Sequence, residues 1–203
     1  KQRRINVTAP SPFPRLFEPG LIGDLRIRNR VAMAPITTIY GADNGDMTEI
    51  TVKYYEERAR GGVGLIISEA VCVDAPEGRQ FATLPCLDRE GLIPSHNEVV
   101  EAVHSYDAKI ALQLHHAGRL ADPRIMKYGQ VPVGPSKITS TTSWRQIAEP
   151  RELTIEEIQR IVRKYAEAAD RGKRAGYDAI ELHMAHGYLP HSFIAEKTNQ
   201  RTD

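Results

Sequence analysis

Short apolar runs alternate with longer, helix-like segments along most of this chain. The apolar runs lie at residues 31–34, 64–68, 109–114 and 178–183, and helix-like segments at about 49–60, 95–106 and 155–175 separate them. Apolar runs this short are typical of buried strands, because a helix of normal length needs a longer segment. Strands that alternate with helices in this way form parallel sheets with right-handed crossovers. The pattern therefore predicts an α/β protein.

The helix predicted at 155–175 has the clearest boundaries. Thr154 and Glu157 have the spacing of a capping box, which satisfies two amide donors at the helix start. Gly176 suits the C′ position just after the helix end. An apolar stripe at helical spacing is expected to pack into the core, and it consists of Ile158, Ile161, Val162, Tyr165 and Ala169.

Two architectures are open to such a chain, a doubly wound sheet and a barrel. The first needs a glycine-rich turn directly after a strand, whereas Gly61, Gly62 and Gly64 precede one and are expected to end a helix. The barrel is favoured because polar or small residues follow every predicted strand, namely Thr37, Glu69, Ala70, Gln113, His115, His183 and His186. We predict the (β/α)8 TIM-barrel type with only about the first four βα units present, preceded by an N-terminal β-hairpin at 21–29.

The chain divides into two parts of unequal size. Residues 1–15 contain three prolines and no apolar period, so we expect an extended N-terminal arm. Residues 16–203 are expected to form one domain, the N-terminal half of the barrel. The connection at 120–150 exceeds the usual loop length, which predicts a lid or a partly disordered loop. Its residues 140–144 are expected to be solvated rather than bound to substrate.

Composition excludes several classes of partner. A net charge of +1 over 203 residues gives no reason to expect nucleic acid or an anionic membrane. No apolar run approaches the length of a membrane span, and no signal peptide is recognisable, so a cytoplasmic protein is expected. Cys72 and Cys86 fit no zinc or redox motif and are expected to be reduced, buried thiols.

The last predicted strand ends in His183, His186, Gly187 and Tyr188, and this cluster carries the chemistry. Two imidazoles can donate hydrogen bonds to one oxygen, and a neighbouring phenol can transfer a proton. We predict that His183, His186 and Tyr188 are catalytic. His115 and His116 are adjacent on a strand and point to opposite faces, so at most one enters the site and one is expected to be exposed. Three further histidines are expected to be ordinary surface or helix residues: His96, His104 and His191.

Four segments resemble the old yellow enzyme family of FMN-dependent ene-reductases. They are NRVAMAP at 29–35, YYEERARGGVGLIISE at 54–69, QLHHAGR at 113–119 and the stretch from ELHMAHGYL to the end at 181–203. The segments follow the order of the family over nearly the whole chain. The third and fourth are more similar to the 2,4-dienoyl-CoA and enoate reductase branch than to the yeast type.

The resemblance implies an NAD(P)H-dependent oxidoreductase that uses FMN to reduce the C=C bond of a small α,β-unsaturated carbonyl or enoyl compound. His183 and His186 would bind the carbonyl oxygen and Tyr188 would protonate the α-carbon. Gln113 would bind the pyrimidine edge of the flavin, and Thr37 would donate to its O4 region. Small side chains and backbone groups beside the ring would come from Ala34, Pro35 and Ala70.

The resemblance has limits. Some relatives carry a redox-tuning cysteine where this chain has Thr37. The family binds the flavin phosphate on loops after the seventh and eighth strands, and its basic residue facing the flavin also comes later than Asp203. An iron–sulfur cluster is expected only in a longer parent protein.

Two alternatives remain open at this point. A metal-dependent hydrolase would use His115, His183 and His186, but their spacing is not the His-x-His of such barrels and no carboxylate completes the set, so no metal is expected. The second alternative is a catalytically incompetent half-barrel that acts as a folding, assembly or interaction unit. Its unpaired sheet edges favour self-association or pairing with a missing C-terminal half.

Overall fold

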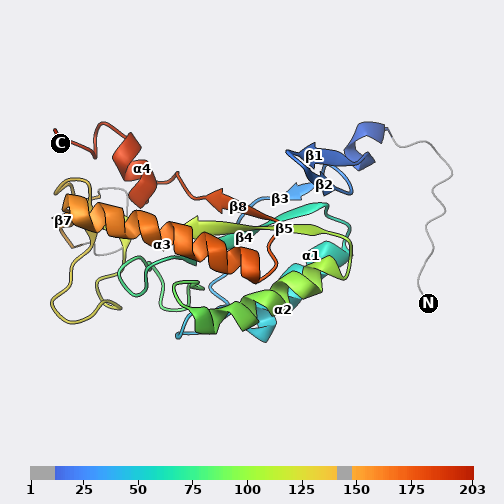
Figure 1. Cartoon of the computed structure of the whole chain (residues 1–203), viewed down its shortest axis with the longest axis horizontal. Coiled ribbons are helices and arrows are strands. Elements are labelled where there is room, and N and C mark those ends of the chain that lie inside the picture. The colour runs from blue at the N-terminus through green and yellow to red at the C-terminus, as the bar shows by residue number, and fades with distance from the viewer. Residues whose placement is uncertain (1–11, 141–147) are drawn as a thin grey trace.

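The computed structural model describes residues 12–140 and 148–203, and a four-stranded parallel sheet lies at its centre (Figure 1). The sheet consists of β3 (Ala32–Met33), β4 (Leu65–Cys72), β5 (Lys109–His115) and β8 (Ala179–Leu182), in the order β3-β4-β5-β8. All three strand pairs are parallel, so the carboxyl ends of the strands meet at one edge. The predicted α/β class and the parallel sheet are confirmed.

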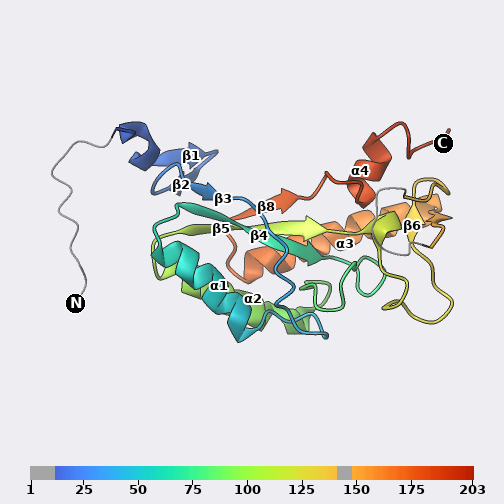
Figure 2. The same ribbon diagram turned by 180° about the vertical axis from the view of Figure 1, so that it is seen from behind.

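Three helices cover one face of this sheet (Figures 1 and 2). They are α1 (Glu49–Arg60), α2 (Ile93–His104) and α3 (Ile155–Arg174), close to the predicted segments. The helix α2 begins two residues before the predicted start, because Pro94 fits the first turn of a helix, where no amide donor is needed. The described residues thus lack the two-sided layering of a doubly wound sheet.

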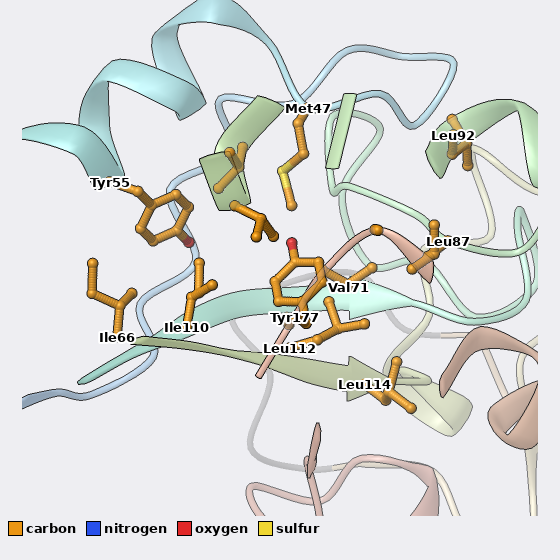
Figure 3. Close-up of a cluster of buried hydrophobic side chains, with 14 of the residues drawn as sticks. Met47, Tyr55, Ile66, Val71, Leu87, Leu92, Ile110, Leu112, Leu114 and Tyr177 are labelled. Carbon is orange, nitrogen blue, oxygen red and sulfur yellow. The ribbon is translucent and has the colours of Figure 1, made fainter. Parts of the chain in front are cut away.

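The core lies between the helices and the sheet. Ile110, Leu112 and Leu114 alternate along β5 and point toward the helices, as period two requires. Figure 3 shows them beside Tyr55 of α1 and Tyr177, whose hydroxyl is 2.9 Å from His96 Nδ1. His96 lies on α2, in agreement with the helix alternative, but it does not lie at the surface and is fully buried. Its ring is tolerated there because Nε2 also contacts the carbonyl oxygen of Cys86, at 3.0 Å.

Near the amino ends of the strands, an N-terminal segment covers the opposite face of the sheet. The predicted hairpin forms there from β1 (Gly20–Ile22) and β2 (Leu25–Ile27), which pair antiparallel. Ile27 packs against Leu65 and Ala111 on the sheet, and the carboxyl end of the same face is left free of this contact. The preceding arm is not extended at its end, because Pro14–Phe17 forms a 3-10 helix, η1; residues 1–11 lie outside the described residues.

The helix α3 begins and ends as predicted. The Glu157 amide donates to Thr154 Oγ1 at 3.3 Å, the Thr154 amide donates to Glu157 Oε2 at 2.9 Å, and Gly176 has a φ of +97°. The apolar stripe is only partly in the core, since Ile161 is buried but Val162 is 62% exposed. The stripe is wider than the surface that β8 and α4 cover, and its exposed part lines an apolar groove of about 320 Å³ beside Leu182.

The remaining elements connect these layers. They are η2 (Glu90–Leu92), η3 (Gly118–Leu120), β6 (Val133–Gly134), β7 (Arg151–Glu152) and α4 (Leu189–Ile194). The long connection at 120–150 is held at both ends, because β6 pairs with β7; its residues 141–147, with Trp144, lie outside the described residues. Within the described ranges, no helix has the length and apolar character needed to cross a membrane.

Candidate active site

The free part of the sheet face carries a row of side chains from three strands. Ala70 on β4 is level with Gln113 on β5, and Gln113 is level with Glu181 on β8. One residue pair further along, His115 of β5 follows Gln113 on the same face, and His183 follows Glu181. Sequence analysis proposed Ala70, Gln113 and His183 for a site, and the structure brings them to one face.

A β-bulge in β4 sets which residue enters this row. Ile67 is level with Ala111, but the next paired residue is Ala70, level with Gln113, so β4 has one residue more than β5 between these pairs. The Gln113 amide donates to Ser68 Oγ at 3.0 Å across the bulge. Beyond the bulge β4 goes on pairing with β5 as far as Cys72, instead of ending at Ser68 as predicted, and the small Ala70 stands where Glu69 would otherwise stand.

The Gln113 side chain is buried and has a fixed orientation. Its Nε2 donates to Glu181 Oε1 at 2.8 Å. A carboxylate can only accept hydrogen bonds, so the amide nitrogen must face Glu181 and the amide oxygen is left for another donor. Glu181 was not among the predicted site residues; the signal for it is its period-two spacing between Ala179 and His183.

Four rings gather at the carboxyl ends of β5 and β8. The Tyr188 ring lies edge-on to His115, with centroids 4.4 Å apart, and to His183, with centroids 4.8 Å apart. His183 and His186 have centroids 5.3 Å apart and nearly perpendicular planes. The three residues predicted to be catalytic are thus adjacent, and His115 lies behind them.

A tight turn after β8 produces this arrangement. The His183 amide donates to the Leu114 carbonyl oxygen at 3.0 Å and so continues the β5–β8 ladder. His186 and Gly187 then take φ values of +59° and +82°, which reverse the chain. The left-handed region is open to glycine but costs other residues, so His186 is held in a strained conformation. The turn ends at Tyr188, which directly precedes α4.

Burial keeps two of the imidazoles neutral. It lowers the pKa of His183, and the neighbouring His186 lowers it further, although Glu181 acts in the opposite direction. Burial also lowers the pKa of His115 well below its ordinary value. Both ring nitrogens of His115 are buried without a hydrogen-bond partner. A neutral imidazole donates one N–H and accepts at the other nitrogen, so His115 and His183 are polar groups that carry no positive charge.

The predicted residues after β3 form an accessible segment at the same end of the sheet. Ala34 and Thr37 are exposed and Pro35 is half-buried. Residue 38 links this segment to β4, since the Thr38 amide and hydroxyl both donate to the Glu69 carboxylate. Sequence analysis noted Glu69 only as a strand-end residue and placed it in no site.

The two adjacent histidines point to opposite faces of the sheet as expected, but their exposure differs from the expectation. His115 enters the ring cluster, whereas His116 accepts from the Gly118 amide at Nδ1, 3.0 Å away. Both are fully buried, so neither is the exposed residue that was expected. The His116 ring lies beside Asp74 and Gly78, in the segment that follows β4, and the His115 ring lies against His183 and Tyr188.

The metal-site alternative finds no support in the described ranges. No cluster there joins three or more histidine, cysteine, aspartate or glutamate side chains in an arrangement that could hold an ion. Cys72 and Cys86 are free and buried, as expected.

Comparisons with known proteins agree with this geometry. A sequence model of the NADH:flavin oxidoreductase / NADH oxidase family matches residues 15–203. The chain is 48% identical over 191 residues to an NADH oxidase of Thermoanaerobacter brockii, covering 94% of this chain and 29% of that protein. It is 38% identical over 191 residues to an NADPH dehydrogenase of Listeria welshimeri, covering 93% of this chain and 54% of the relative.

Solved structures give the same result. Morphinone reductase in complex with tetrahydroNAD superposes with a TM-score of 0.87 and 37% identity, over 94% of this chain and 55% of the other. An old yellow enzyme homologue from Zymomonas mobilis gives a TM-score of 0.84 and 33% identity, over 94% and 54% of the two chains. The chain thus spans about half of these proteins, and less of the NADH oxidase.

Proposed function

The chain belongs to the NADH:flavin oxidoreductase / NADH oxidase family, and we propose that it serves in reducing the C=C bond of α,β-unsaturated carbonyl compounds with FMN and NAD(P)H. The observation that carries the proposal is the cluster of His183, His186 and Tyr188 beside the row that contains Gln113. We also propose that the four βα units belong to a (β/α)8 barrel. The one-sided helices support this, because the strand face away from them becomes the barrel interior.

The residues at the carboxyl end of the sheet fit a flat heteroaromatic ring. Ala34, Pro35 and Ala70 leave room beside their backbone, and Thr37 offers a hydroxyl. Gln113 offers an amide oxygen and a second N–H, held in place by Glu181, which suits a ring edge that carries both acceptors and donors. FMN bound at this site would supply the hydride, with NAD(P)H as the electron donor.

The histidines and the tyrosine act on the substrate. His183 and His186 donate to the carbonyl oxygen, and these bonds strengthen as negative charge develops there. A low pKa keeps His183 neutral, so it polarises the oxygen without giving up a full proton. Tyr188 holds the proton that is delivered to the α-carbon, and its ring is fixed by edge contacts with His115 and His183.

The test is Tyr188→Phe, which removes the proton donor and keeps the ring. We expect reduction of an enone to slow by roughly 10²–10⁴-fold, the usual contribution of a general acid, with flavin reduction by nicotinamide unchanged. Stopped-flow absorbance of the flavin measures the two half-reactions separately. Tyr54→Phe on α1 is the matched control and should change neither. Equal slowing of both half-reactions would refute the role of Tyr188.

Ligand binding tests the two histidines independently. Replacing both His183 and His186 by alanine should weaken binding of phenolic or carbonyl ligands roughly 30-fold, since each neutral hydrogen bond contributes about 1 kcal/mol. Titration of the flavin absorbance measures the dissociation constant. An unchanged affinity removes both residues from the proposed oxyanion site.

We further propose that, where no C-terminal half of a barrel pairs with it, the chain associates with a second copy of itself through the β8 edge of the sheet. Within the described residues β8 has only one neighbouring strand, and its Leu182 is 51% exposed. An open strand edge with apolar side chains favours pairing with another chain. Sedimentation at rising protein concentration should show a dimer, and a monomer at all concentrations would contradict this proposal.

A further inference from the structure

Glu69 is a fully buried carboxylate that the proposed chemistry does not use. It lies in the β-bulge of β4, next to Ala70, and its side chain leaves the row that faces Gln113. Burying a carboxylate is costly unless it is hydrogen-bonded, so the contacts of Glu69 show what its burial serves.

Those contacts all belong to the segment that follows β3. The Thr38 amide donates to Oε2 at 3.0 Å, and the Thr38 hydroxyl donates to Oε1 at 2.7 Å. The Ile39 amide also donates a hydrogen bond to the carboxylate. Burial raises the pKa of the Glu69 carboxyl, and the hydrogen bonds that its two oxygens accept from Thr38 and Ile39 oppose that rise.

The segment held in this way needs a restraint. Ile39 has a φ of +57°, a region that branched side chains rarely occupy because Cβ comes too close to the backbone there. The Tyr40 amide donates back to Thr38 Oγ1 at 3.2 Å, so the turn closes around the hydroxyl that Glu69 binds. The main chain of Glu69 is fixed in turn, since its amide donates to the Tyr55 hydroxyl at 2.6 Å.

We propose that Glu69 is a positioning residue, which fixes the turn at Thr38 and Ile39 and thereby holds Thr37 at the rim of the flavin site. The inference rests on the proposed function, because Thr37 is placed beside the flavin only there. Glu69 touches neither flavin nor substrate and acts through Thr37. Its burial on the strand that also supplies Ala70 couples the two sides of the site.

The first measurement needs no flavin. Glu69→Gln keeps the shape of the side chain but replaces one acceptor oxygen by an amide group, so Thr38 loses a partner. Hydrogen exchange of the Thr38 and Ile39 amides should accelerate roughly 10-fold or more, while the amides of β5 keep their protection. Glu77→Gln is the matched control, because Glu77 is a partly buried carboxylate that accepts from Gln130, and it should leave these amides unchanged.

The second measurement asks whether the effect reaches the flavin. Quenching of FMN fluorescence should show a dissociation constant raised several-fold by Glu69→Gln and by Thr37→Val. In a Thr37→Val background, Glu69→Gln should add little, because its effect runs through Thr37. Glu77→Gln again changes nothing.

Each outcome decides a different statement. Unchanged exchange at Thr38 and Ile39 overturns the inference. Faster exchange with unchanged FMN affinity, or full additivity with Thr37→Val, also overturns it and leaves Glu69 a stabilising residue only. A wild-type chain that binds no FMN refutes the proposed function and the flavin part of this inference, whereas the exchange experiment still decides whether Glu69 holds the turn.

Discussion

The buried ring of His96 makes the stability of this protein depend on pH. Burial lowers the pKa of His96 from 6.5 to about 4, although the contact with the Cys86 carbonyl oxygen acts in the opposite direction. Unfolding exposes the ring and restores its ordinary pKa. Between these two values the unfolded chain therefore binds a proton that the folded chain does not, and the free energy of unfolding falls as the pH falls from 6.5 toward 4.

The magnitude follows from the two pKa values of His96. At pH 5 the unfolded ring is almost fully protonated and the folded ring almost fully neutral, which removes about 2 kcal/mol relative to pH 8. In the steep part of this range the slope approaches about 1.4 kcal/mol per pH unit. Burial also lowers the pKa of His116 to about 4, so the wild-type protein should lose more than His96 alone accounts for.

The contribution of His96 to this loss of stability can be isolated with His96→Gln. The glutamine cannot be protonated, and it keeps one hydrogen-bonding group in reach of Cys86 and Tyr177. Urea unfolding at pH 8 and pH 5 gives the free energies for both proteins. The variant should be less stable at pH 8, by about 1–3 kcal/mol for the lost buried hydrogen bond, but its decrease on going to pH 5 should be smaller by about 2 kcal/mol.

The matched control is Gly172→Ala on α3, which removes no titratable group and should keep the pH dependence of the wild type. If His96→Gln and the wild type lose the same free energy between pH 8 and pH 5, the buried neutral ring is not the cause and the reasoning fails. A larger decrease in the free energy of unfolding of the variant would refute the reasoning as well.

Two further predictions concern α3. Thr154→Ala removes the capping hydroxyl and should lower the free energy of unfolding by about 1 kcal/mol in urea, whereas Thr154→Ser should restore it. Gly172→Ala would place a Cβ 2.6 Å from Leu112 Cδ2, so we expect a loss of about 1–3 kcal/mol in the same assay; a neutral effect would mean that α3 shifts freely on the sheet.

The elements of the fold were largely predictable, because they depend on local patterns. The helix α1 has the predicted bounds, and α3 the predicted capping box and terminal glycine. The bulge in β4 could not be predicted, since nothing in the sequence of residues 65–72 marks the extra residue. It arises from pairing with β5, a contact between segments far apart in the sequence.

The histidines show where sequence reasoning about the site stops. Period two correctly separated His115 from His116, yet both proved buried, because loop packing and not strand alternation decides exposure at a strand end. Glu69 and Glu181 were missed as partners of Thr38 and Gln113 because these contacts also depend on long-range packing. Their hydrogen bonds join residues about 30 and 70 positions apart, which no local spacing reveals.

Stability and chemistry are separated along one strand of this sheet. On the face of β5 away from the helices, Ala111 packs against the hairpin, Gln113 binds Glu181, and His115 contacts Tyr188. Side chains on that face thus change from apolar to polar to aromatic toward the carboxyl end. The apolar part fixes the sheet before any ligand binds, and the polar groups beyond it are buried and held by contacts with Glu181, His183 and Tyr188. A substitution at Ala111 should therefore lower the free energy of unfolding, whereas one at Gln113 should weaken the binding proposed for FMN.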